Sequence, residues 1–477
     1  MSSILQTSVM RGRYRPAGLP FIAAVAATAA GSISTVVSCN RQAGRDAKPN
    51  VLFIAVDDLN DWGEPFGGYP GVQTPNLSRL AKEGQLFTRA YCSAPASNPS
   101  RASLLTGIRP SSSGVYHNNQ PWRPALPDAV TLPQYFTANG YEVEGSGKIF
   151  HGGYNDTASW PVYHPVERSP VPPGSPLLGK AHFDWAPVQV TDQEMGDYKN
   201  VTYAVDFLKK KKDRPFFLAV GFTRPHLPWY VPQKYFDLYP VDNITRPDVI
   251  ANDLSDIPKA GVKIAKPEGD HRFIVENGQW EKAIQGYLAS ISFFDAQLGR
   301  LLDALEASGQ KENTVIVLFG DHGWHLGEKE HWRKFALWEE AARVPFIIVA
   351  PGVTKPDSRS ERTVNLLDIY PTLLELCGLP AKEELEGNSI VPLLKRPDAE
   401  WEHPSLTTHG KDNHALRSER WRYIRYADGS EELYDHDTDP QEWVNLAQKA
   451  EYEPVKRDLS RWLPDKNVPD AKPAKKK

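Results

Sequence analysis

Two pairs of potential metal ligands, Asp57-Asp58 and Asp321-His322, each follow a short apolar run of this 477-residue sequence. Adjacent carboxylates at the end of a buried strand are unfavourable unless a cation compensates their charge. Oxygen-rich ligands favour one hard divalent cation, with Ca²⁺ expected before Mg²⁺ or Mn²⁺. A dinuclear zinc site would need more His and Asp ligands than these segments provide.

The stretch Ser97-Asn98-Pro99-Ser100-Arg101 predicts an anion-binding turn. Pro99 disfavours the α conformation at Asn98, so Ser97 and Asn98 are expected in an extended turn before a helix that begins at Ser100. The first N–H groups of such a helix favour an anion, and Arg101 adds a fixed positive charge. A capped helix start is the structural alternative. The functional interpretation places Ser97 as a nucleophile.

Four further side chains could move protons or hold an oxyanion: Lys148, His151, His226 and Lys334. Lys148 and His151 follow a strand that gives way to a glycine-rich turn. His226 stands in a proline-flanked segment whose rigid backbone suits a proton donor. Taken one by one, such residues are more often structural, but together they suit a sulfate or phosphate ester.

Several continuous apolar runs predict central strands that are covered on both faces. Ligands bind at the carboxyl ends of such strands, where the polar residues stand. We therefore expect an α/β fold with a large mixed, mostly parallel sheet sandwiched by helices. The predicted strands are 51–56, 85–91, 140–147, 216–221, 314–319 and 344–350, and the predicted helices are 75–83, 201–212 and 283–308.

The C-terminal part predicts a smaller subdomain, 401–465, after a catalytic domain at 50–400. Residues 421–426 alternate like an antiparallel strand, Asp428-Gly429 is a hairpin turn signal, and 432–435 pairs back. A small antiparallel sheet with a final helix is expected. Residues 466–477 are expected to form a disordered basic tail.

Residues 1–39 resemble a secretory signal that ends in a relaxed lipobox at Cys39. This predicts export to the periplasm or cell surface and a lipid anchor on Cys39, followed by a linker at 40–49. An uncleaved anchor and ordinary signal-peptidase cleavage are the alternatives. Cys92 and Cys377 are then expected as free thiols. The net charge of −4 gives no reason to expect nucleic-acid binding.

Residues 151–195 show no clear periodicity and predict a loop excursion on the substrate side. Four tryptophans of the loop-rich segments have two interpretations. They could stack on sugar rings, or they could form loop core. These residues are Trp122, Trp160, Trp185 and Trp229.

The motif Ser97-x-Pro99-Ser100-Arg101, followed by Leu105-Thr106-Gly107, resembles the signature of the formylglycine-dependent sulfatases, within the alkaline-phosphatase-like superfamily. The resemblance covers roughly residues 49–450. It is closest to the iduronate 2-sulfatase-like branch through Lys148-Ile149-Phe150-His151, Arg224-Pro225-His226-Leu227-Pro228 and Asp321-His322-Gly323-Trp324 with Lys334 downstream.

The resemblance implies that Ser97 is oxidised to formylglycine. A serine stands where many relatives have cysteine, which implies a radical-SAM maturase as partner, and Cys92 lacks Pro-Ser-Arg at the required offset. The implied substrate is a sulfated polysaccharide or oligosaccharide. A phosphonate or phosphodiester hydrolase of the same superfamily and a non-catalytic surface glycan-binding protein are the alternatives.

The roles implied by the resemblance fall on ten residues. Asp57, Asp58, Asp321 and His322 would bind Ca²⁺ with the modified Ser97. Arg101 and Lys148 would hold the modified side chain. Lys148, His226 and Lys334 would grip the sulfate, His226 would protonate the leaving alcohol, and His151 would act on the aldehyde hydrate.

Overall fold

An eight-stranded sheet is the central element of the computed structural model, which describes residues 48–474. Seven strands run parallel to one another and β11 runs antiparallel to both of its neighbours. The predicted signal segment, the lipobox at Cys39 and most of the linker lie outside the described residues. The strands, in sheet order, are β12 (Ser358–Asn365), β2 (Gln85–Tyr91), β11 (Phe346–Val349), β8 (Thr314–Gly320), β1 (Asn50–Val56), β6 (Phe216–Phe222), β3 (Glu142–Gly147) and β4 (Val162–His164).

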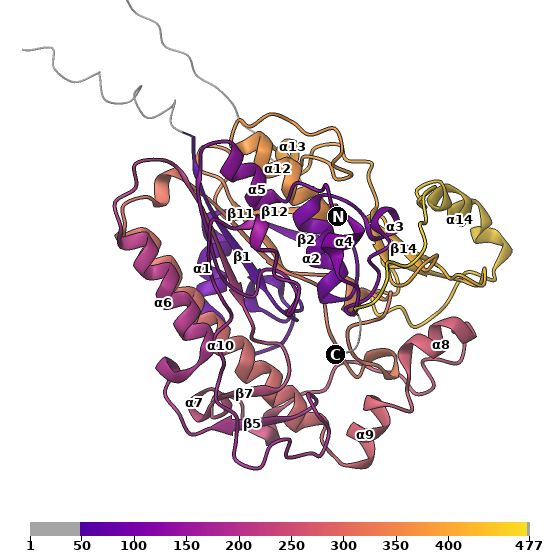
Figure 1. The fold of residues 1–477 in the computed structure, drawn as a ribbon. Coiled ribbons are helices and arrows are strands. Elements are labelled where there is room, and N and C mark those ends of the chain that lie inside the picture. The colour runs from indigo at the N-terminus through magenta and orange to yellow at the C-terminus, as the bar shows by residue number, and fades with distance from the viewer. Residues whose placement is uncertain (1–47, 475–477) are drawn as a thin grey trace, which may run out of the picture. The chain divides into compact units, whose positions relative to one another are not determined.

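Helices cover both faces of this sheet (Figure 1). Alternate residues of β1 divide between two buried clusters, with Leu52 and Ile54 in one and Val51 and Phe53 in the other. The first cluster includes residues from α1 (Pro75–Glu83), α6 (Gly196–Lys209) and α10 (Trp280–Ala307). The second includes residues from α2 (Ser97–Thr106), α5 (Leu132–Ala138), α12 (Ile369–Leu376) and α13 (Val391–Lys395). The predicted sandwich is confirmed.

A second sheet of four antiparallel strands follows in the sequence, with a short helix after it. The predicted hairpin is confirmed, since Trp421 pairs with Asp435 and Arg425 with Glu431. Buried Arg422 donates to Glu339 of α11, which ties the small sheet to the large domain. These elements are β13 (Ser405–Thr408), β14 (His414–Arg417), β15 (Trp421–Arg425), β16 (Glu431–Asp435), α11 (Glu339–Ala342) and α14 (Glu453–Ser460).

The remaining short elements connect these layers. Two further pairs of strands form small ladders, β5 with β7 and β9 with β10. The bounds are α3 (Pro110–Ser113), α4 (Trp122–Ala125), β5 (Trp185–Val188), β7 (Trp229–Pro232), α7 (Gln233–Phe236), α8 (Lys259–Ala265), α9 (Asp270–Glu276), β9 (His325–Leu326) and β10 (Trp332–Arg333).

The segment 151–195 is more regular than the loop excursion that the sequence predicts. It contributes β4, which extends the edge of the main sheet, and β5, which pairs with β7. Strands of three and four residues are too short to show an alternation in the sequence. The expected loop excursion is therefore interrupted by these two short strands.

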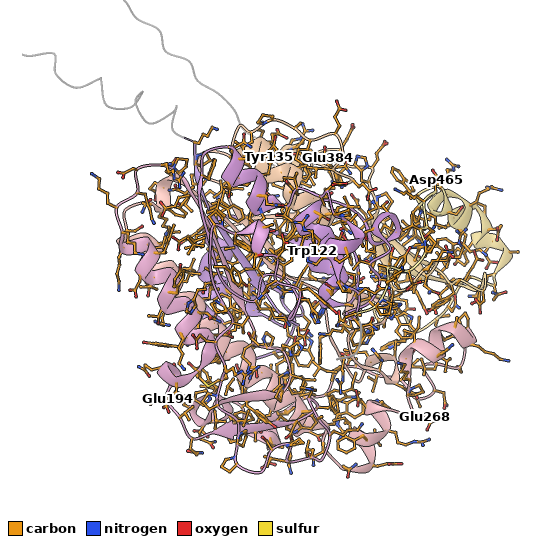
Figure 2. All side chains as sticks on the ribbon, viewed as in Figure 1. Trp122, Tyr135, Glu194, Glu268, Glu384 and Asp465 are labelled. Carbon is orange, nitrogen blue, oxygen red and sulfur yellow. The ribbon has the colours of Figure 1, made fainter. Side chains whose placement is uncertain are left out.

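The four tryptophans of these segments are core residues. Trp122 and Trp229 are almost fully buried, and Trp160 and Trp185 expose less than a tenth of their surface. Trp122, labelled in Figure 2, stacks on Phe150 with ring centroids 5.1 Å apart. Of the two interpretations, the structure therefore supports loop core over sugar stacking.

The C-terminal segment, up to residue 474, is hydrogen-bonded to the large domain. The backbone N–H groups of Val468, Ala471 and Ala474 donate to Ser111, Gly114 and Asn119. Up to residue 474, the chain thus differs from the disordered tail expected for 466–477. Cys92 and Cys377 are both buried free thiols, as predicted. Within 48–474, no helix has the length and apolar character needed to cross a membrane.

Replacing Gly221 by alanine should destabilise the fold. A Cβ at Gly221 in β6 would overlap the backbone of Lys148, which follows the neighbouring strand β3. We expect Gly221→Ala to lower the free energy of unfolding by about 1–3 kcal/mol. Denaturant unfolding measures it, with Gly152→Ala as control, because a Cβ at Gly152 meets no atom within 4 Å. Equal stability of the two variants would contradict this packing.

Candidate active site

The carboxyl ends of four neighbouring strands bring the predicted site segments to one edge of the sheet. The backbone N–H of Lys148 donates to Gly221 at 3.0 Å, and that of Asp57 to Phe222 at 3.2 Å. The N–H of Asp321 donates to Val56 at 3.1 Å. The end of one strand thus accepts a backbone hydrogen bond from the first polar residue that follows the neighbouring strand.

Asp57, Asp58, Asp321 and His322 form a cluster that is fully buried. One ligand atom from each lies within 4.8 Å of those of the others. The backbone N–H of Asp58 donates to Asp321 Oδ1 at 3.1 Å, which joins the ends of β1 and β8. His322 Nδ1 lies 3.0 Å from the carbonyl oxygen of Gly323 and is positioned to donate to it. Its Nε2 then faces the carboxylates with a free lone pair, as a metal ligand requires.

Ser97 lies against this cluster, at the start of α2. Its Oγ is 3.2 Å from Asp57 Oδ1 and 3.0 Å from His322 Nε2. The Nζ of Lys334 donates to the same hydroxyl at 3.4 Å. The residue that the sequence marks as a nucleophile therefore touches the predicted metal ligands.

The helix begins three residues earlier than expected, so the prediction of an extended turn at Ser97 and Asn98 is wrong. Ala96 is the N-cap, and the N–H of Ser100 already donates to its carbonyl oxygen at 3.0 Å. Pro99 lies in the first helical turn, where a missing N–H costs nothing. Asn98 is held by its side chain, which donates to Gln120 O at 2.6 Å. That tertiary contact overrides the local preference of a residue before proline.

Arg101 joins the site segments from one turn inside α2. Its guanidinium donates to Asp321 Oδ2 at 2.8 Å and to Asp57 Oδ1 at 3.2 Å. It also donates to the carbonyl oxygens of Lys148 at 2.6 Å and Ile149 at 2.8 Å. These contacts fix two carboxylates and the end of β3, so its geometry is that of a positioning residue for the cluster.

Two buried lysines complete the charge balance. Lys148 Nζ pairs with Asp57 Oδ2, and Lys334 Nζ pairs with Asp58 Oδ1 at 2.6 Å. With Arg101, three fixed cationic groups face the three carboxylates of the cluster. A divalent cation would add two positive charges, which a bound sulfate group and an ionised nucleophile would offset.

The electrostatics of the carboxylates fit a cation. Burial opposes ionisation of Asp57, but the charges of Lys148 and Arg101 outweigh it and hold the pKa of Asp57 well below its usual value. Burial and the charge of Asp57 raise the pKa of Asp58, despite the charge of Lys334. Asp58 Oδ2 is buried and has no hydrogen-bond partner. The charge of Asp58 is thus only partly compensated, and the neutral Nε2 of His322 lies beside it. A divalent cation would satisfy both as ligands.

Both predicted histidines lie beside the cluster. His226 Nε2 is 4.0 Å from Asp57 Oδ2 and 3.8 Å from Asp58 Oδ2. Burial and the charge of Lys148 lower the pKa of His226 well below its usual value, against the charge of Asp57. The same causes lower the pKa of His151 to about 3, and its Nδ1 has no hydrogen-bond partner. Every predicted site residue is thus brought to this edge of the sheet.

The sequence did not indicate two positioning residues, Tyr287 and Ser100. Tyr287 lies on the apolar stripe of α10, where the pattern indicates only core. Its hydroxyl donates to Asp58 O at 2.8 Å and accepts from Asn60 N at 2.9 Å. Asp58 has a φ of 61°, an uncommon conformation that these bonds hold in place. Ser100 Oγ donates to Asp321 O at 2.5 Å. A buried tyrosine hydroxyl needs a hydrogen-bond partner, and this need was the one feature of the sequence that could have indicated the role of Tyr287.

The chain is similar to known sulfatases over most of its length. The sulfatase family model matches residues 49–379, and the model of the C-terminal part of N-sulphoglucosamine sulphohydrolase matches residues 327–468. A sulfatase of Formosa agariphila is 41% identical over 88% of this chain and 87% of its own length. The iduronate 2-sulfatase of Mus musculus is 35% identical over 69% of each chain.

A solved structure with the substrate D-glucosamine-2-N,6-O-disulfate has the same fold. It superposes with a TM-score of 0.71 at 22% identity, over 87% of this chain and 97% of that chain. Fold and site define a hydrolase of the alkaline-phosphatase-like class. The chain belongs to the sulfatase family and is a sulfuric ester hydrolase similar to iduronate 2-sulfatases.

Loss of the Tyr287 hydroxyl should weaken cation binding. Without it, the left-handed conformation of Asp58 loses its carbonyl bond, so we expect Tyr287→Phe to bind Ca²⁺ about tenfold more weakly. Calorimetric titration of the metal-free protein measures this directly. The control is Tyr235→Phe, which removes a hydroxyl that donates to Asp192 instead. Unchanged Ca²⁺ affinity in Tyr287→Phe would contradict the positioning role.

Proposed function

We propose that this sulfatase removes sulfate esters from polysaccharides or oligosaccharides, with a formylglycine made from Ser97 and one bound Ca²⁺. The observation that carries the proposal is the position of Ser97 Oγ, in contact with Asp57, His322 and Lys334. Similarity to iduronate 2-sulfatases, which act on a sulfated sugar, supports the substrate class.

The proposed modification supplies what serine lacks. A serine hydroxyl is a poor nucleophile without an activating base. The imidazole that contacts Ser97, that of His322, bonds through Nδ1 to the carbonyl oxygen of Gly323 and not to a carboxylate as in serine hydrolases. The hydrate of formylglycine would supply one hydroxyl to attack sulfur as the bond to the leaving alcohol breaks, and a second hydroxyl whose deprotonation would expel sulfate and restore the aldehyde. Asp57, Asp58, Asp321 and His322 would hold Ca²⁺, which supplies positive charge for the ionised hydroxyl and a sulfate oxygen.

Lys148, Lys334 and His226 surround the position that a sulfate group would occupy. Both ammonium groups lie at the cluster, within contact of Asp57 and Asp58. Their charges, fixed before the substrate arrives, offset the negative charge on the oxygens of the transferring group. Arg101 holds the carboxylates in register and so keeps the lysines where they act.

Two histidines divide the proton transfers. His226 Nδ1 lies 2.5 Å from the carbonyl oxygen of Leu227, which leaves Nε2 directed at the cluster. A bound sulfate ester is an anion, and its charge favours the protonated form of His226, which can then protonate the leaving alcohol. The low pKa of His151 keeps it neutral, as a base acting on Ser97's modified side chain must be.

Maturation and export complete the proposal. Because the signature residue is serine, the modifying enzyme is a radical-SAM maturase of the serine type. The N-terminal segment directs the chain to the periplasm or cell surface, with a lipid anchor at Cys39. These features rest on the sequence pattern alone.

Ser97→Ala should abolish turnover of an aryl sulfate, because alanine offers no hydroxyl to oxidise. The fold should persist, which circular dichroism and thermal unfolding would show. Ser103→Ala is the matched control, since Ser103 is a buried serine of the same helix whose hydroxyl has no hydrogen-bond partner. The control should keep near-normal activity.

The alternatives give different results in the same assay. Near-normal activity in Ser97→Ala would refute the mechanism. Faster turnover of an aryl phosphate or phosphonate than of the aryl sulfate by the parent protein would favour the hydrolase of phosphorus esters. A parent protein that binds sulfated glycans without turning over any ester would be a binding protein.

A further inference from the structure

A groove of about 900 Å³ lies between the C-terminal ends of α6 and α10. Its lining includes the apolar atoms of Val205, Leu208 and Ala304. Five cationic side chains and one carboxylate complete it: Lys209, Lys210, Lys211, Lys212, Arg300 and Asp303. The whole chain carries a net charge of −4, so this positive excess is local.

Part of this positive charge is paired with other groups of the protein. Lys209 pairs with Asp206 at 2.9 Å, and Lys212 pairs with Glu142 at 2.9 Å while its ammonium lies over the ring of Phe207. Lys209 also stands in the last turn of α6, where a cation stabilises the helix dipole. These two lysines are accounted for by the fold.

The other three cations are not paired with a carboxylate of the described residues. Lys210 and Lys211 are exposed and form no ion pair with any carboxylate in the part of the chain that the structure describes. Arg300 lies over the ring of Tyr198 and donates to Tyr198 O, Gln297 Oε1 and Thr202 Oγ1, so its partners are neutral and no carboxylate of the described residues pairs with it. The one carboxylate of the lining, Asp303, is already bound to Arg79 at 2.6 Å. The groove therefore presents free positive charge.

The groove is remote from the catalytic cluster. Helix α6 leads into the start of β6, and α10 leads into the start of β8, so both helix ends lie at the amino edge of the sheet. The site lies at the carboxyl edge. Strands β6 and β8 have seven residues each, so the two edges are separated by about 20 Å. A single sugar unit in the active site cannot reach the groove.

We propose that this groove binds a sulfated polysaccharide chain and holds the polymer on the enzyme while other parts of it are desulfated. The inference rests on the proposed substrate class. The free charges of Lys210, Lys211 and Arg300 complement sulfate groups, and the apolar lining between the helices suits the C–H faces of sugar rings. A concave groove fits a chain, whereas a membrane surface would call for a flat or protruding basic face.

The test compares two doubly substituted proteins, each in a Ser97→Ala background so that the polymer is not consumed. Lys210→Glu/Lys211→Glu changes the groove. Lys449→Glu/Lys466→Glu makes the same change in net charge at two exposed lysines in the C-terminal part of the chain. Migration in native gels containing ι-carrageenan or heparin, with dextran as uncharged control, gives the dissociation constants. We expect about tenfold weaker binding for the groove variant and little change for the control.

Three results would overturn the inference. They are equal binding by both variants, no retardation by either sulfated polymer, and lysine-dependent capture by phosphatidylglycerol vesicles without polymer binding. The groove and control substitutions are also made in the unmutated protein, where aryl sulfate turnover should stay at the parental rate. That assay tests the proposed catalysis separately, because loss of turnover in the parent protein would leave the binding result standing.

Discussion

Repulsion among three buried carboxylates is the constraint on which the site depends. Asp57, Asp58 and Asp321 are fully buried within a few ångströms of one another, and each must find a positive partner to stay ionised. Arg101 serves two of them, and Lys148 and Lys334 one each. Asp58 remains undercompensated, which favours a cation beside it. With a divalent cation bound, the cluster would present net positive charge to a sulfate group.

The parallel sheet is what allows this balance to form. The carboxylates and Lys148 come from segments between residues 57 and 321, and the shared carboxyl edge of β3, β6, β1 and β8 brings them together. Lys334 joins them from the end of β10, in a separate ladder. Helix α2 then places Ser97 and Arg101 against that edge, one at its first residue and one a turn inside. The nucleophile and one of the three balancing cations thus derive from the same short helix.

Much of this arrangement could be predicted from the sequence, because continuous apolar runs such as 51–56 and 314–319 mark buried strands and the residues after them mark the ligand edge. The predictions were wrong where the deciding contact was tertiary. Asn98 enters the helix because its side chain reaches Gln120, and Tyr287 serves the site through a hydroxyl hidden in an apolar stripe. Strand β4 was missed because three residues show no periodicity. The groove at Lys209 to Lys212 depends on two helix ends that only the fold places side by side.

The central claim is that Ser97 acts as an aldehyde. Mass spectrometry of the tryptic peptide Ala90–Arg101, from active protein made in its native host, tests it most directly. The account predicts a peptide lighter than its sequence mass by the dihydrogen lost on oxidation, in a fraction that rises with specific activity. An unmodified serine in fully active protein would contradict the account and would indicate that Ser97 acts as an ordinary serine nucleophile.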